Sequence, residues 1–142
     1  MGFLTKLLLG DGRLKPELRA ALESEGLVLL EEGLAGRIGY SRFKAPGRRH
    51  NGKVTGVRAG LGLSELRLVV YCRSGKSKLI DTRFADSRFS RLDVFVEGDD
   101  TLAIRVDYDR MDIPKVSGQI TIRAKTRRAA EIVDEVRARR GG

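Results

Sequence analysis

The residues best suited to chemistry are basic side chains gathered in one short stretch. No acidic residue occurs between Glu32 and Glu65, and the cations of this interval are densest in segment 44–53, which reads KAPGRRHNGK. Proline and glycine residues interrupt the segment, so it is predicted to be a loop between two strands. Ammonium and guanidinium groups that converge from such a loop can bind a phosphate or another anion. The candidate anion-binding residues are Lys44, Arg48, Arg49 and Lys53.

Three interpretations of this basic stretch remain open. A solvated hairpin loop in an arginine-rich protein would have the same composition. A functional site would contact either a lipid headgroup or nucleic acid, since both present phosphates. Single-stranded nucleic acid also calls for exposed aromatic side chains on which bases stack. Only Tyr40, Phe43 and Tyr71 lie near the stretch, so nucleic acid is the weaker of the two anionic partners.

Two glycine-containing motifs resemble nucleotide-binding loops but lack required residues. Segment 74–77 reads SGKS, yet Val70 stands where the phosphate-binding loop needs its first glycine. A hairpin turn explains this segment better. Segment 60–62 reads GLG, but Glu65 occupies the position of the third glycine of a dinucleotide loop, and a strand rather than a helix is expected to follow.

Candidate metal ligands and nucleophiles are equally incomplete. Asp107, Asp109 and Asp112 cluster where a strand is expected to end, without the glycine and glutamate of an EF-hand loop. Acidic turn residues are the simpler explanation. His50 is the only histidine and Cys72 the only cysteine, so neither a histidine-based metal site nor a Cys–His pair is supported. The sequence predicts no catalytic residue, metal site or cofactor.

Composition places the chain among soluble globular proteins. Its 142 residues carry 33% charged side chains and a net charge of +9, which favours acidic partners. The length predicts one folded domain with an ordinary core. A single cysteine excludes an internal disulfide framework, and a reducing cytoplasm is the expected location.

Residues 1–26 are predicted to form an N-terminal extension of two short helices. The first, Met1–Gly10, carries Phe3, Leu4, Leu7, Leu8 and Leu9 around Lys6. It is far shorter than the ~20 residues of a transmembrane helix and lacks the flanks of a signal peptide. This helix is expected to pack on its own domain or a sister subunit, or to bind a membrane surface or partner. The second begins near Pro16 and ends before Gly26.

The remaining chain alternates apolar and polar residues with a period of two, which predicts strands. A short apolar strand over 27–30 is followed by seven segments separated by turn-forming residues. Close spacing between them predicts antiparallel pairing, because parallel strands need longer crossovers. The seven segments cover 35–43, 53–59, 64–73, 77–84, 92–96, 102–108 and 116–124.

The chain ends in an amphipathic helix predicted to start at Thr126, a suitable N-cap residue. Spacings of three and four residues place its apolar side chains in one stripe. A short helix with one such stripe is not stable alone, so it must cover the open side of the strands. The stripe consists of Ala129, Ile132, Val133 and Val136.

Seven antiparallel strands followed by one C-terminal helix resemble the pleckstrin-homology (PH)-like superfold. Segment 116–123 (VSGQITIR) and segment 126–133 (TRRAAEIV) look like the last strand and capping helix of bacterial members. The resemblance covers about residues 35–140 and rests on element order. It implies an α+β fold: a seven-stranded antiparallel β-sandwich or barrel, capped by the C-terminal helix, in a domain spanning 27–142. In eukaryotic relatives the loop corresponding to 44–53 binds phosphoinositide headgroups, a function that bacterial members generally lack.

These observations predict a non-enzymatic PH-like binding or scaffold module. Its expected partner is another protein or a copy of itself, with no small-molecule substrate. The alternative is an anionic-ligand module in which the basic segment 44–53 binds a lipid headgroup or nucleic acid.

Overall fold

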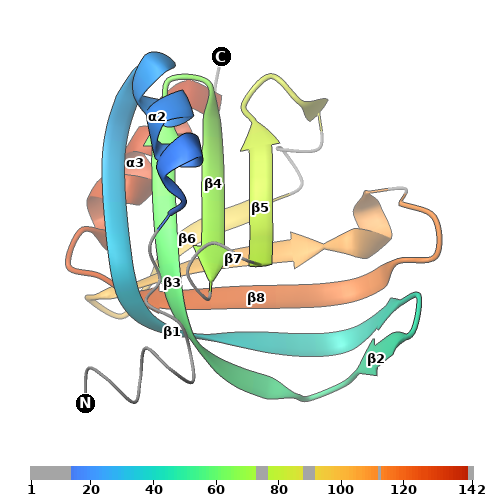
Figure 1. Cartoon of the computed structure of the whole chain (residues 1–142). Coiled ribbons are helices and arrows are strands. Elements are labelled where there is room, and N and C mark those ends of the chain that lie inside the picture. The colour runs from blue at the N-terminus through green and yellow to red at the C-terminus, as the bar shows by residue number, and fades with distance from the viewer. Residues whose placement is uncertain (1–13, 73–76, 88–91, 112, 141–142) are drawn as a thin grey trace.

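The computed structural model describes residues 14–72, 77–87, 92–111 and 113–140, which form an α+β fold (Figure 1). One helix precedes the strands, a short 3₁₀ helix lies between the last two, and one helix ends the fold. The elements are α2 (Pro16–Ser24), β1 (Leu27–Ala45), β2 (Arg48–His50), β3 (Val54–Ser64), β4 (Arg67–Cys72), β5 (Ser77–Arg83), β6 (Leu92–Glu97), β7 (Thr101–Asp107), η2 (Tyr108–Arg110), β8 (Ser117–Lys125) and α3 (Ala129–Arg140).

The strands form one antiparallel sheet that curls into a half-barrel (Figure 1). Seven strands follow one another in the order β5-β4-β3-β1-β8-β7-β6, and the short β2 pairs with β1 beside this path. The predicted α+β class, with curled antiparallel strands and a C-terminal helix, is confirmed. Within the described residues β5 pairs only with β4 and β6 only with β7, so the sheet has two free edges instead of closing.

Strand β1 joins the two halves of the sheet and bends strongly between them (Figure 1). Its residues from Leu27 to Gly39 pair with β3, and those from Gly36 to Lys44 pair with β8. At Gly36 a side chain has no space, because a Cβ atom there would lie 2.4 Å from the backbone oxygen of Arg123. Glycine at the crossing therefore lets three strands approach closely.

The predicted break between a strand at 27–30 and another at 35–43 is wrong, because β1 runs through both. Two irregularities mislead the sequence pattern. Gly33 has a φ of +71° and Arg42 a φ of +49°, each where the pairing register shifts. Such bulges insert an extra residue and break the period of two without ending the strand.

Helix α3 covers the concave side of the half-barrel and packs mainly on β6 and β7. The predicted stripe is buried in the main core, with Ile132 fully enclosed. The helix begins at Ala129, three residues later than predicted. Thr126 still caps it: its Oγ1 accepts the N–H of Arg128 at 3.0 Å and donates to Glu31 at 2.7 Å.

Helix α2 packs on the outer face of the sheet against β1 and β3. Leu14 and Leu22 form a second apolar cluster with Val69 and Tyr71 of β4. Strand β4 is therefore buried on both faces, which explains its uninterrupted apolar run. The predicted pair of N-terminal helices is not established: α2 is present, and the expected Met1–Gly10 helix lies outside the described residues.

Two strand boundaries also differ from the prediction. Strand β3 continues through segment 60–62 to Ser64, so this GLG segment lies inside a strand rather than before one. Strand β4 begins only at Arg67. Leu66, which lies inside the predicted strand 64–73, is 46% exposed ahead of β4. No helix of the described chain is both long and apolar enough to cross a membrane.

Candidate binding surfaces

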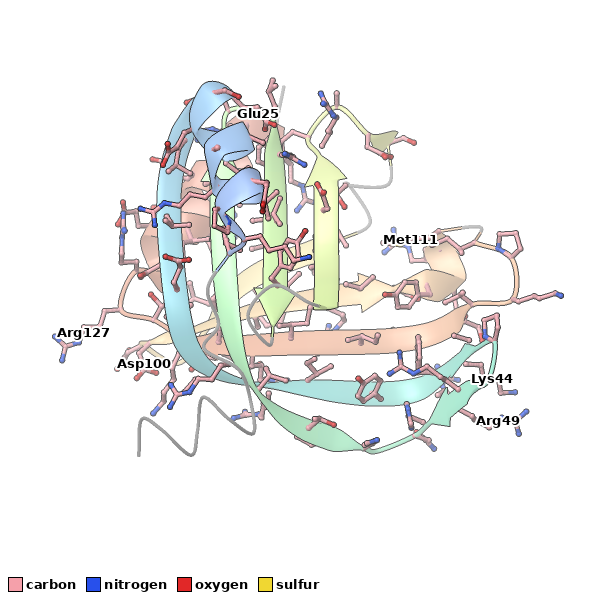
Figure 2. The ribbon with its side chains drawn as sticks, viewed as in Figure 1. Glu25, Lys44, Arg49, Asp100, Met111 and Arg127 are labelled. Atoms are coloured by element: carbon pink, nitrogen blue, oxygen red, sulfur yellow. The ribbon has the colours of Figure 1, made fainter. Side chains whose placement is uncertain are left out.

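The predicted basic loop is a β-hairpin made by the end of β1 and the short β2. Phe43 pairs with His50, and Lys44 pairs with Arg49. Gly47, with a φ of +74°, lies in the tight turn between the two strands. Figure 2 shows the side chains of Lys44 and Arg49 at the end of the molecule remote from Arg127.

The four candidate anion-binding residues are all exposed, but they do not converge on one point. Lys44 and Arg49 are cross-strand partners and share one face of the hairpin. The neighbouring Arg48 faces the other way, with its guanidinium carbon 5.8 Å from the centre of the Phe43 ring. Lys53 follows the hairpin, and its carbonyl oxygen accepts the Tyr40 N–H at 2.9 Å.

Four aromatic rings form a cluster under the hairpin. The Tyr40 ring centre lies 5.6 Å from that of Phe43 and 5.0 Å from that of His50. Phe43 also contacts Tyr108, at 5.7 Å between ring centres. Sequence reasoning missed this cluster because Tyr108 comes from η2, which is distant in sequence from the hairpin. The rings hold the hairpin against the half-barrel and orient Arg48 above Phe43.

Two ring groups of this cluster, His50 and Tyr108, have pKa values shifted by their surroundings. The pKa of His50 lies below 6.5 because of partial desolvation and then the positive charges of Lys53 and Arg48. Burial raises the pKa of the Tyr108 hydroxyl. Since a positive environment disfavours the imidazolium, the His50 ring is uncharged at neutral pH although cations surround it.

A cavity of about 180 Å³ lies on the open side of the half-barrel, where β5 faces the β6–β7 pair. Its eight lining residues comprise five apolar side chains and three polar ones, a threonine, a carboxylate and a tyrosine. The sequence pattern marks the apolar members only as core residues, since nothing in it indicates that the sheet stays open. The lining residues are Ile80, Asp81, Thr82, Leu92, Val106, Tyr108, Met111 and Ile113.

A second cavity, of about 450 Å³, lies beside the C-terminal end of α3. Arg139 lines it and is bound to Glu65 at 2.8 Å and to Glu135. Two carboxylates therefore offset this guanidinium, while Arg83 and Arg140 add two further cations to the lining. The other lining residues are Leu66, Arg83, Phe84, Ala85 and Arg140.

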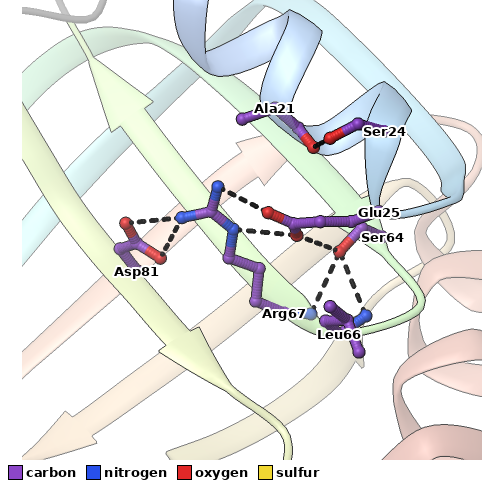
Figure 3. Close-up of polar contacts among 7 residues, drawn as sticks. All are labelled: Ala21, Ser24, Glu25, Ser64, Leu66, Arg67 and Asp81. Carbon is purple, nitrogen blue, oxygen red and sulfur yellow. Dashed lines mark hydrogen bonds and ion pairs between the residues drawn. The ribbon is translucent and has the colours of Figure 1, made fainter.

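Arg67 connects α2 to the sheet through a polar network (Figure 3). Its guanidinium binds Glu25 at 2.9 Å and Asp81 at 3.1 Å. Glu25 also accepts the hydroxyl of Ser64 at 2.9 Å, and Ser64 accepts the N–H groups of Leu66 and Arg67. Every member of the network has a partner, which indicates a structural role in docking α2.

The remaining sequence motifs have structural roles or lie outside the described residues. Asp107 accepts the N–H of Asp109 at 3.1 Å, and Asp109 accepts that of Gly118 at 3.0 Å. These are turn contacts, and the described part of the chain holds no group of three side chains suited to a metal ion. Asp112, segment 74–76 and the side chain of Cys72 lie outside the description.

Comparison with protein-family models and with curated proteins found no match to this chain. Its fold and its surfaces therefore carry the functional argument.

Proposed function

We propose that this chain is a PH-like, non-enzymatic module that binds another protein chain, either a partner or a second copy. The curled antiparallel sheet and the C-terminal helix are compatible with that superfold. The observation that carries the proposal is the open side of the half-barrel, where an edge of β5 that no described strand pairs with borders a cavity with five apolar lining residues.

The open side has both features that an added strand requires. Strand β5 pairs with β4 alone among the described strands, so its other edge can hydrogen-bond to an incoming segment. Beside it, the cavity of about 180 Å³ is lined by Ile80, Met111 and Ile113 and has room for one apolar side chain. Backbone pairing supplies affinity in such an arrangement, and the cavity selects the side chain.

A second copy of the chain is a specific form of this partner. The N-terminal sequence Met1–Gly10 is rich in leucine and carries one charge from a side chain, that of Lys6. An apolar segment of this kind can associate two chains when it is buried between them.

Light scattering coupled to gel filtration tests the proposal on the full chain. The variant Ile113→Lys places a charge in the cavity wall, and Val54→Lys adds the same charge at a side chain that is 63% exposed elsewhere. The proposal predicts association that is lost in Ile113→Lys, retained in Val54→Lys and weakened by removal of residues 1–12. A monomer at every concentration would exclude the second copy and leave a different protein as the partner.

A phosphate-bearing ligand at the hairpin is the second candidate, favoured by the four exposed cations Lys44, Arg48, Arg49 and Lys53. Reversal of Arg48, Arg49 and Lys53 to glutamate should then abolish binding to anionic vesicles. Inorganic polyphosphate as a competitor separates a headgroup from a soluble phosphate. Unchanged binding of the reversed variant would exclude this candidate.

A further inference from the structure

The outer face of the sheet carries a broad set of cations below the part that α2 covers. In β1, β8 and β7 the alternate residues Ile38, Ile122 and Ile104 point into the core. The residues between them therefore point outward, on the side away from α3. We call this surface the basic face; its cations are Arg37, Lys44, Arg49, Arg105, Arg123 and Lys125.

Two of these cations are placed against each other. Arg37 of β1 and Arg123 of β8 are direct cross-strand partners. Like charges in this relation destabilise a sheet unless an anion lies between or beside them. Glu97 binds the Nε of Arg123 at 2.9 Å, and the pKa of Glu97 is lowered by that bond and by the charges of Arg123, Arg37 and Arg105. One carboxylate serves three guanidinium groups, so this part of the face retains an excess of positive charge.

The middle of the basic face carries mainly short side chains, with Val54 and Gln119 as the larger ones. Gly39 pairs with Thr121 on one side and with Val54 on the other, and Ser41 pairs with Gln119. This strip of mainly short side chains extends from the Arg37–Arg123 pair to the Lys44–Arg49 pair. On β8 six residues separate Arg123, opposite Arg37, from Ser117, opposite Lys44, which corresponds to about 20 Å. Asp93 and Glu97 lie on β6, at the far margin, and Asp107 of β7 pairs with Gln119; the six cations of the face outnumber these three acids.

We propose that the basic face binds the phosphate backbone of duplex nucleic acid without reading its sequence. Two groups of cations, one around the Arg37–Arg123 pair and one at the Lys44–Arg49 pair, lie at the two ends of this strip. Such an arrangement suits a rigid, linear polyanion of high charge density. A single strand is disfavoured because Phe95, an aromatic residue of this face, lies under the Arg105 guanidinium at 5.4 Å and is not free to stack with bases. A membrane surface is disfavoured because Val54 is the one large apolar side chain that the described face exposes strongly.

The test is salt-titrated binding of the full chain to a duplex of mixed sequence, with a single strand and anionic vesicles as parallel probes. The variant Arg37→Gln/Lys44→Gln/Arg49→Gln removes three cations from the basic face. The control Lys15→Gln/Arg127→Gln/Arg137→Gln removes the same charge from exposed positions elsewhere. Figure 2 places Arg127 at the opposite end from Lys44 and Arg49.

The duplex should bind most tightly, with an affinity that falls steeply as salt rises. The basic-face variant should reduce the slope of log K against log salt by about 3 and weaken binding at least ~10-fold at low salt, while the control should retain the wild-type slope. Equal loss in both variants, or stronger binding to the single strand or the vesicles, would overturn the proposal. Binding in Ile113→Lys should be unchanged, which separates this surface from the open side.

Discussion

Arg67 and Glu25 form a two-point ion pair that joins the end of α2 to the sheet. The Nε of Arg67 lies 3.0 Å from one carboxylate oxygen of Glu25, and an NH₂ group lies 2.9 Å from the other. Both side chains are only 16% exposed, so solvent screens this pair less than one on the surface. Helix α2 thus has a polar anchor at its C-terminal end and an apolar one through Leu22.

Glu25→Ala should lower the free energy of unfolding by about 2 kcal/mol, because it leaves part of a shielded guanidinium without a partner. Glu23→Ala on the same helix is the control. Its pair with Arg19 spans 3.5 Å between side chains that are about half exposed, so it should cost less than ~0.5 kcal/mol. Urea unfolding compares the two, and equal losses would mean that Arg67 does not anchor α2.

Gly36→Ala should destabilise the fold by about 1–3 kcal/mol, because the new Cβ would clash with the Arg123 backbone oxygen at the crossing of three strands. Gly56→Ala is a matched control, since it lies in the adjoining β3 with no atom within 4 Å of an added Cβ. That variant should change the stability by less than ~0.5 kcal/mol. Thermal unfolding of both tests whether the bend of β1 depends on a missing side chain.

The Glu97–Arg123 pair predicts a specific loss of stability in acid. The hydrogen bond from Arg123 holds the pKa of Glu97 below 4.5 in the folded state. A carboxyl group with a depressed folded pKa stabilises the protein above its unfolded pKa, and this contribution is lost as the pH falls through the folded pKa. Between pH 6 and pH 3 the wild type should therefore lose more stability than Glu97→Gln. Parallel pH dependences of the two proteins would contradict this assignment.

His50 provides a spectroscopic test of the hairpin field, because it is the only histidine. Its pKa should be below 6.5 and should rise toward that value in Lys53→Gln and in Arg48→Gln, since each variant removes a nearby positive charge. Arg137→Gln, on α3, should leave the pKa unchanged. An NMR titration of the ring protons measures all four proteins, and a His50 pKa insensitive to both hairpin variants would place the basic side chains away from the ring.

The helical and strand periodicities carried most of the fold. The stripe of α3 is recognisable because Ile132, Val133 and Val136 recur at helical spacing, and packing inside the half-barrel agrees with that pattern. The pattern failed in β1, where the bulges at Gly33 and Arg42 break the alternation while pairing continues. At β4 the strand was predicted, but its start was placed three residues too early, and burial of its outer face by α2 was not foreseen.

The candidate surfaces were harder to predict from the sequence than the fold. The basic stretch was visible as composition, but the division of Arg48 from Lys44 and Arg49 depends on the hairpin register. The basic face combines Arg37, Arg105 and Arg123 from three strands that are distant in sequence. The cavity on the open side depends on which strands remain unpaired, a property of the whole sheet.

The central claim is that another protein chain docks on the open side of the half-barrel. A photo-crosslinking amino acid in place of Thr82, which lines the cavity, tests this contact directly. The account predicts one discrete adduct with a protein chain, lost when Ile113→Lys is added and retained with Val54→Lys. No adduct at position 82, or one that persists in Ile113→Lys, would contradict it.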